Sequence, residues 1–126
     1  MKHLIILLVF TFSLIGCKTA KSLERPVGDI KEIVVDDETL LVDVRIPEEF
    51  KAETASTKAI NIPLAELEKN IDKIKSHKKV VVYCNKGRQA DQAMEILLKN
   101  GATNVYDGTT WRNVKAIIEE SKTKKD

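Results

Sequence analysis

The fold is decided by the stretch Val80-Val81-Val82-Tyr83-Cys84-Asn85-Lys86-Gly87-Arg88-Gln89. Its first four residues, rich in β-branched side chains, predict the strongest strand in the chain. The apolar residues that follow have helical spacing and end at an Asn-Gly pair, which predicts an amphipathic helix: Ala90, Ala93, Met94, Leu97 and Leu98. We therefore expect Cys84 in a short loop between the carboxyl end of a buried strand and the start of a helix.

The rest of the chain alternates between strand-like and helix-like patterns. Residues 40–44 form a continuous apolar run, typical of a strand buried on both faces of a parallel sheet. Two further strands are predicted over residues 59–62 and 104–106, and helices over residues 29–34, 47–50, 64–74 and 111–118. This alternation predicts an α/β domain whose mainly parallel sheet is covered by helices on both faces.

The loop after the central strand has the features of an anion site. Backbone N–H groups of a short loop that leads into a helix point at one spot, and the helix dipole adds positive potential there. The anion is either a bound one or the Cys84 thiolate itself, and Lys86 and Arg88 add cations at the rim. Cys84 is therefore the predicted nucleophile. The alternative, a cysteine that only fills space in the core, explains none of these neighbours.

The beginning of the chain predicts export. Lys2 and His3 precede an apolar run, residues 4–12, that is too short to span a bilayer and is typical of a secretory signal. Leu14-Ile15-Gly16-Cys17 resembles the bacterial lipobox, which implies removal of the signal and acylation of Cys17. The predicted organisation is a signal peptide (1–16), a lipidated cysteine and tether (17–25), a folded domain (26–121) and a basic tail (122–126). We expect an exported bacterial lipoprotein, anchored to the membrane on the periplasmic side.

Cysteine, histidine and charge counts exclude several classes of protein. The chain has two cysteines, so acylation of Cys17 leaves Cys84 as a free thiol with no partner for a disulfide. His77 is the single histidine outside the predicted signal, so no histidine-based metal cluster is expected. The net charge of +2 argues against a general nucleic-acid role.

Four segments, in this order, resemble the rhodanese family: Leu41-Val42-Asp43-Val44-Arg45, Pro47-Glu48-Glu49-Phe50, Ala59-Ile60-Asn61-Ile62-Pro63 and Val82-Tyr83-Cys84-Asn85-Lys86-Gly87-Arg88-Gln89. The resemblance implies a three-layer α/β/α domain with a mainly parallel five-stranded sheet. It also implies a sulfurtransferase in which Cys84 takes sulfane sulfur from thiosulfate or a persulfide. The acceptor would be a thiol, cyanide or a thioredoxin-like protein, and the family needs no metal or organic cofactor. We expect the enzyme to be a monomer.

The resemblance also assigns roles to individual residues. Substrate would be bound by the loop residues Asn85, Lys86, Gly87, Arg88 and Gln89. Asp43, Arg45 and Glu49 match a second motif and are expected to hold the strand, loop and helix together, with Glu48 or Glu49 pairing with Arg45.

The sequence departs from the family in two segments. Residues 53–58 lack the Gly-His-Ile element that many relatives carry, and Thr109-Thr110 stands where many have Gly-Gly. Both segments lie near loops that shape the pocket, so donor and acceptor preference stay open.

Two other functions are compatible with a cysteine in this kind of loop. Phosphatases and arsenate reductases of related fold need a longer loop with Arg six residues after the Cys, whereas position 90 is Ala. A non-catalytic rhodanese-like binding or redox-sensing module is the remaining alternative. Binding modules of this kind usually replace the Cys, whereas this chain retains Cys84, whose oxidation would supply the redox chemistry of a sensor.

Overall fold

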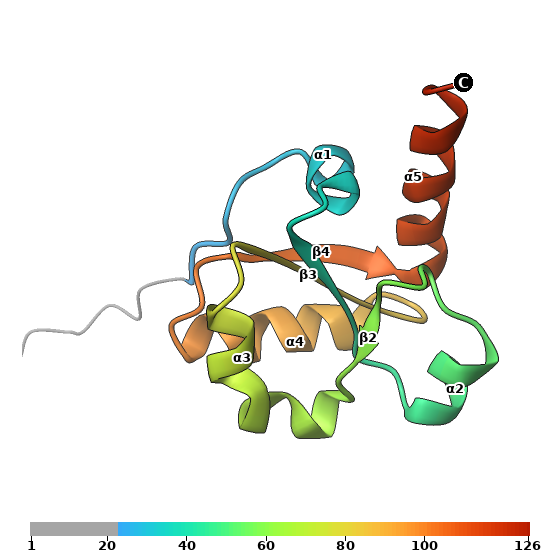
Figure 1. The fold of residues 1–126 in the computed structure, drawn as a ribbon. Coiled ribbons are helices and arrows are strands. Elements are labelled where there is room, and N and C mark those ends of the chain that lie inside the picture. The colour runs from blue at the N-terminus through green and yellow to red at the C-terminus, as the bar shows by residue number, and fades with distance from the viewer. Residues whose placement is uncertain (1–22) are drawn as a thin grey trace, which may run out of the picture.

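A four-stranded, fully parallel sheet in the order β2-β1-β3-β4 lies at the centre of the protein (Figure 1). The computed structural model describes residues 23–126, so the predicted signal, Cys17 and most of the tether lie outside the described residues. The strands are β1 (Thr39–Asp43), β2 (Ile60–Asn61), β3 (Lys79–Cys84) and β4 (Val105–Thr110). The described residues form four strands, one fewer than the five that the resemblance implies, and residues 23–29 ahead of α1 form no strand. Pro26 and Gly28 in that segment both disfavour one.

Strand β3 occupies the middle of the sheet, with β1 on one side and β4 on the other. Leu41 is in register with Val81 across the first pair, and Val81 with Tyr106 across the second. The β3–β4 pairing shifts register between Val82 and Tyr83, which is the signature of a bulge. Because all four strands are parallel, their carboxyl ends meet at one edge of the sheet, where the chain places its loops.

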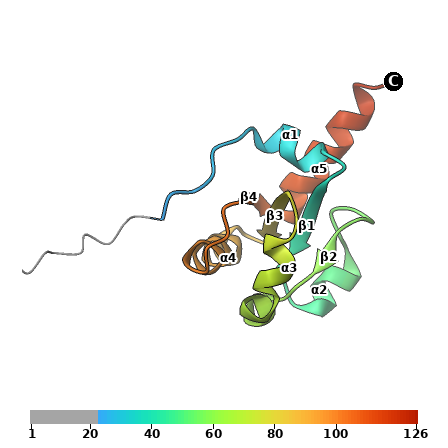
Figure 2. The ribbon, with the colours of Figure 1, turned by 60° about the vertical axis from the view of Figure 1, so that its left-hand side comes forward.

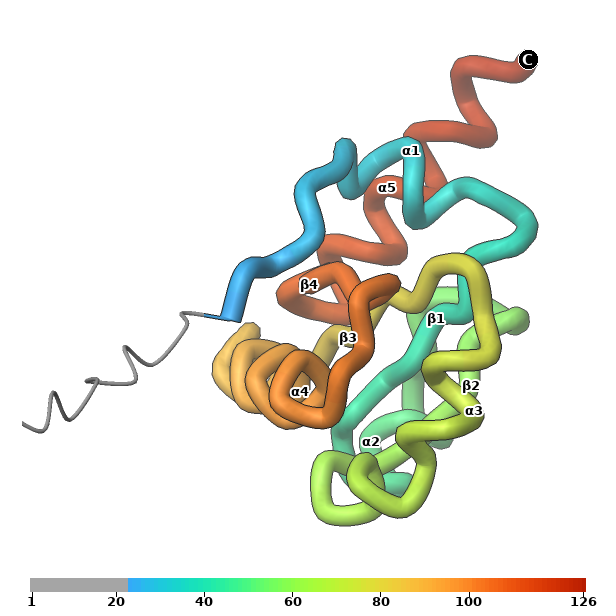
Figure 3. The backbone as a smooth tube through the Cα atoms, turned by 90° about the vertical axis from the view of Figure 1, so that its left-hand side faces the viewer, coloured from blue at the N-terminus to red at the C-terminus, as the bar shows by residue number. Residues whose placement is uncertain are grey.

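Helices cover both faces of the sheet, which confirms the three-layer prediction (Figures 2 and 3). One face carries α1 (Ile30–Val35) and α5 (Trp111–Thr123). The other carries the 3-10 helix η1 (Leu64–Asn70), α3 (Ile71–Lys75) and α4 (Arg88–Lys99). The short helix α2 (Pro47–Ala52) follows β1 and has no fully buried residue. None of the helices in residues 23–126 is long and apolar enough to cross a membrane.

The alternation of side chains along β3 divides the core in two. Val80, Val82 and Cys84 pack under α4, whereas Val81 and Tyr83 pack under α5. All five are at most 1% exposed, which explains why this strand is apolar without interruption. Cys84 therefore continues a core strand on the α4 side and sits at the end of it.

Three predicted boundaries differ from the structure. The helix expected over residues 64–74 is divided into η1 and α3, because Asn70 between them has φ −115° and ψ 16°, outside the helical region. The last strand extends to Thr110, beyond the expected residue 106, since pairing with β3 supplies backbone partners for a polar stretch. Helix α5 continues to Thr123, two residues past the expected end of the domain.

Candidate active site

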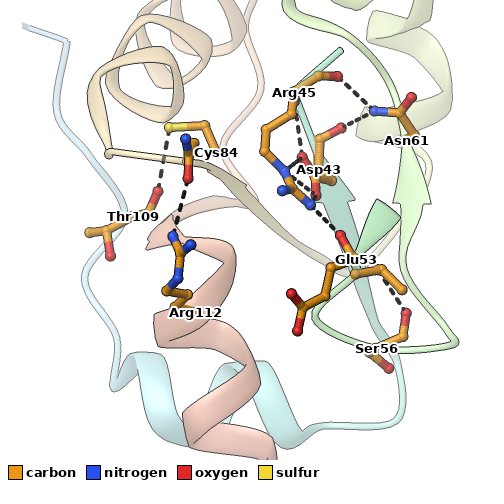
Figure 4. Close-up of polar contacts among 10 residues, drawn as sticks. Asp43, Arg45, Glu53, Ser56, Asn61, Cys84, Thr109 and Arg112 are labelled. Carbon is orange, nitrogen blue, oxygen red and sulfur yellow. Dashed lines mark hydrogen bonds and ion pairs between the residues drawn. The ribbon is translucent and has the colours of Figure 1, made fainter. Parts of the chain in front are cut away.

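Cys84 is the last residue of β3, and its sulfur has hydrogen-bond partners of both kinds. The backbone N–H groups of Gly87 and Ala90 donate to Sγ over 3.0 Å and 3.3 Å. On the other side, the thiol donates to the carbonyl oxygen of Thr109 over 3.6 Å (Figure 4). The two N–H groups stabilise negative charge on the sulfur, and the carbonyl accepts the proton of the neutral thiol. The site thus accommodates the thiol before ionisation and the thiolate after it.

The loop geometry follows from one glycine and one helix start. Gly87 has φ +91°, a left-handed conformation that residues with a side chain rarely adopt. A Cβ atom there would meet nothing within 4 Å, so the backbone conformation and not the space requires glycine. Helix α4 begins at Arg88, as predicted, and the first N–H groups of a helix have no partner within it. One of these, from Ala90, is aimed at the sulfur.

A pocket of about 270 Å³ opens at the sulfur. Its lining residues come from the end of β3, the loop after it and the start of α4, and from the loop and helix after β1: Ile46, Glu49, Cys84, Asn85, Lys86, Arg88 and Gln89. Asn85, Lys86, Arg88 and Gln89 thus lie where substrate residues were predicted, whereas Gly87 contributes its N–H group and no wall. Within residues 23–126, the ammonium group of Lys86 and the guanidinium of Arg88 form no ion pair, so both charges are open to a ligand.

Arg45 pairs with Asp43 and not with the acidic residues of α2. The Arg45 Nε donates to both oxygens of the Asp43 carboxylate over 3.0 Å and 2.9 Å, and Nη2 donates to one over 2.7 Å. Both side chains are buried. The expected pairing of Arg45 with Glu48 or Glu49 is therefore wrong, because the buried carboxylate of Asp43, two residues before Arg45, binds the guanidinium instead. Glu49 lines the pocket instead.

The buried pair fixes the loop that carries the far wall of the pocket. Arg45 Nη2 also donates to the carbonyl of Glu53 over 2.7 Å, just after α2. The amide of Asn61 in β2 donates to the carbonyls of Asp43 and Arg45 over 3.0 Å and 2.9 Å (Figure 4). These bonds connect β1, β2 and the end of α2, the part of the chain from which Ile46 and Glu49 line the pocket.

Two residues near the sulfur were not found from the sequence. Arg112, in the first turn of α5, donates to the side-chain oxygen of Asn85 over 3.2 Å (Figure 4). Its guanidinium also lies 4.5 Å from the centre of the Trp111 ring. Thr109, which contacts the sulfur, has φ 63° and is the one residue other than glycine with positive φ in residues 23–126. The only signal for Thr109 was the departure from Gly-Gly at that segment, and nothing in the sequence pointed to Arg112.

Within the described part of the chain, no group of three or more His, Cys, Asp or Glu side chains is arranged to hold a metal ion.

Comparison with known proteins identifies relatives of this arrangement. A family model described as "Rhodanese-like domain" matches residues 20–109. The chain is 47% identical over 66 residues to thiosulfate sulfurtransferase PspE of Escherichia coli strain K12, covering 51% of this chain and 62% of that protein. The chain spans less than two thirds of the length of the curated relatives it matches.

Solved structures agree with that match. A rhodanese with anions from E. coli superposes with a TM-score of 0.54 at 39% identity, covering 60% of this chain and 89% of that one. A rhodanese-related protein from Thermoplasma volcanium superposes with a TM-score of 0.57 at 28% identity, covering 77% and 93% of the two chains.

Proposed function

The chain belongs to the rhodanese-like domain family, and we propose that it is a sulfurtransferase that carries sulfane sulfur on Cys84. The most direct support is that two backbone N–H groups, from Gly87 and Ala90, donate hydrogen bonds to Sγ. The pocket at this sulfur is also lined by Lys86 and Arg88, which form no ion pair within residues 23–126. A thiolate held in this way is a nucleophile rather than a packing residue. The name of the relative PspE, a thiosulfate sulfurtransferase, agrees with the proposal.

The first half of the reaction loads the cysteine. The thiol proton passes to solvent, and the Cys84 thiolate attacks the outer sulfur of thiosulfate. A new S–S bond forms to Sγ, the S–S bond of thiosulfate breaks, and sulfite leaves with the electron pair of that bond. The two negative charges of thiosulfate favour its approach to Lys86 and Arg88.

The second half returns the enzyme to its starting state. A thiolate or cyanide attacks the outer sulfur of the Cys84 persulfide, and the Cys84 thiolate leaves, held again by the N–H groups of Gly87 and Ala90. Donor and acceptor use one pocket in turn, so the kinetics are of the ping-pong type.

Mass spectrometry after incubation with thiosulfate tests the proposal. We expect the intact protein to gain the mass of one sulfur atom, and cyanide or a reductant to remove it. Cys84→Ser should fold and gain no mass, since a serine hydroxyl is hardly ionised near neutral pH. Cys17→Ser is the matched control and should load like the wild type. A folded wild-type protein that never gains sulfur would instead favour the non-catalytic binding module.

We also propose that residues 1–16 are removed and that Cys17 is acylated, which would place the domain at the membrane on the periplasmic side. The support is the order of basic, apolar and Leu-Ile-Gly-Cys segments in the sequence. Fractionation of cells tests it: the wild type should be found with membranes, and Cys17→Ser should be released. A wild-type protein in the soluble fraction would contradict the proposal.

A further inference from the structure

The pocket at Cys84 carries charges of both signs. Lys86 and Arg88 come from the reactive loop, and Glu49 comes from α2 on the facing wall. In residues 23–126, the Glu49 carboxylate forms no hydrogen bond or ion pair, and neither do the charged ends of Lys86 and Arg88. Three charged residues that line the pocket of Cys84 are thus free to contact a ligand.

This arrangement matches a sulfur donor with charges of both signs better than it matches an inorganic dianion. Thiosulfate would gain attraction from Lys86 and Arg88 but would be repelled by Glu49, whose carboxylate shares the same pocket. The pocket volume of about 270 Å³ is close to the lower end of the range for sites that hold small organic molecules, roughly 300 Å³. Ile46, which is 53% exposed, adds an apolar wall that thiosulfate does not use.

The position of Glu49 is fixed by the core. The N–H group of Glu53 donates to the Glu49 carbonyl over 3.2 Å, and the Glu53 carbonyl accepts from the buried guanidinium of Arg45 over 2.7 Å. Arg45 is in turn held by Asp43. The end of α2 is therefore attached to the centre of the sheet, and the backbone that carries Glu49 is held in place beside the pocket.

We propose, on the basis of the sulfurtransferase function above, that the sulfur donor is the persulfide of an α-amino acid, with Glu49 as the residue that selects it. The carboxylate of the donor faces Lys86 and Arg88, its ammonium group faces Glu49, and its methylene group contacts Ile46. The Cys84 thiolate attacks the outer sulfur of R–S–SH, the S–S bond breaks, and R–S⁻ leaves with the electron pair. The outer sulfur keeps its proton and becomes the terminal S–H of the Cys84 persulfide.

Steady-state kinetics with three donors test this assignment. The donors are cysteine persulfide, the persulfide of its deamino analogue mercaptopropionate, and thiosulfate. Glu49→Gln should raise KM for cysteine persulfide about threefold, the size expected for one partly exposed charge pair. It should lower KM for thiosulfate and for mercaptopropionate persulfide, since both are relieved of repulsion. Glu48→Gln is the matched control, because Glu48 neighbours Glu49 but does not line the pocket, and it should change none of the three values.

The possible outcomes distinguish donor selection by Glu49 from the sulfurtransferase activity of Cys84. If Glu49→Gln shifts KM for all three donors in one direction, or Glu48→Gln reproduces its effect, the selection by Glu49 is overturned while sulfur transfer stands. A wild-type enzyme that does not distinguish cysteine persulfide from mercaptopropionate persulfide would overturn it as well. Failure of every donor to load wild-type Cys84, read by mass, would overturn the proposed function itself.

Discussion

Asp43→Asn removes the negative charge from an ion pair that lies inside the protein, and we expect it to lower the free energy of unfolding by about 3–5 kcal/mol. Asp43 is 0% exposed and Arg45 is 4% exposed, so water cannot solvate the guanidinium once its partner is neutral. In the variant, the N–H₂ group of asparagine would face the Nε and Nη2 donors of Arg45, which bond to both carboxylate oxygens in the wild type. This loss is a large share of the free energy of unfolding, which is about 5–15 kcal/mol for native proteins.

Urea unfolding measures this effect directly. With a dependence on urea of about 2 kcal/mol/M, the midpoint of Asp43→Asn should fall by about 2 M. Glu38→Gln is the control, since it neutralises one partner of the exposed Lys78–Glu38 pair and should cost less than about 1 kcal/mol. The double variant Asp43→Leu/Arg45→Met, which removes both charges, should be more stable than Asp43→Asn alone. Equal losses in Asp43→Asn and Glu38→Gln would refute the reasoning from burial.

Three further predictions concern the residues around the sulfur. Gly87→Ala meets no steric obstacle but strains a left-handed backbone by roughly 1–2 kcal/mol and turns an N–H group away from Sγ. The rate of sulfur loading should fall at least about tenfold, and an unchanged rate would contradict the role of that N–H group. Arg112→Ala releases Asn85 and should raise KM for thiosulfate by about two- to fivefold. Lys115→Ala, which lies near the same ring but pairs with the exposed Glu53 carboxylate and not with the Cys84 loop, should leave KM unchanged. Burial raises the pKa of the Tyr83 hydroxyl, which has no hydrogen-bond partner within residues 23–126. Above pH 10 this tyrosine therefore ionises in the unfolded chain, while the folded protein keeps the proton. The wild type should therefore lose stability above about pH 10, and urea unfolding should show that Tyr83→Phe loses less and is at least as stable near pH 7.

The parts of the fold that the sequence predicted well are those set by local periodicity. The apolar spacing of Ala90, Ala93, Met94 and Leu97 gave helix α4, and all four are buried. The unbroken apolar run from Val80 marked the central strand, since both faces of β3 are covered. Strand β4 was cut short because its second half, Asp107 to Thr110, has no apolar signal of its own.

The reactive loop could be predicted because its functional residues are close together in the sequence. The rest of the site could not be predicted in this way. Cys84, Gly87 and Ala90 lie within seven positions, so a strand–loop–helix pattern places their groups together. Thr109 and Arg112 contact the loop although they lie more than twenty residues from it in the sequence. Their positions depend on the bulge in the β3–β4 pairing and on the start of α5, which the apolar periodicity does not predict. The misassigned partner of Arg45 has a similar cause: charge alone does not tell which of several nearby carboxylates is buried beside a guanidinium.

The central place of β3 has a consequence for how the molecule opens. Val81, Val82 and Tyr83 are bonded to a strand on each side and fully covered, whereas β2 is two residues long and lies at an edge. Amide hydrogens of β3 should therefore exchange with deuterium only when the whole domain unfolds, and those of β2 should exchange through local fluctuations. Cys84 follows directly on the slowest-exchanging strand, so the reactive sulfur is attached to the part of the protein that opens least often.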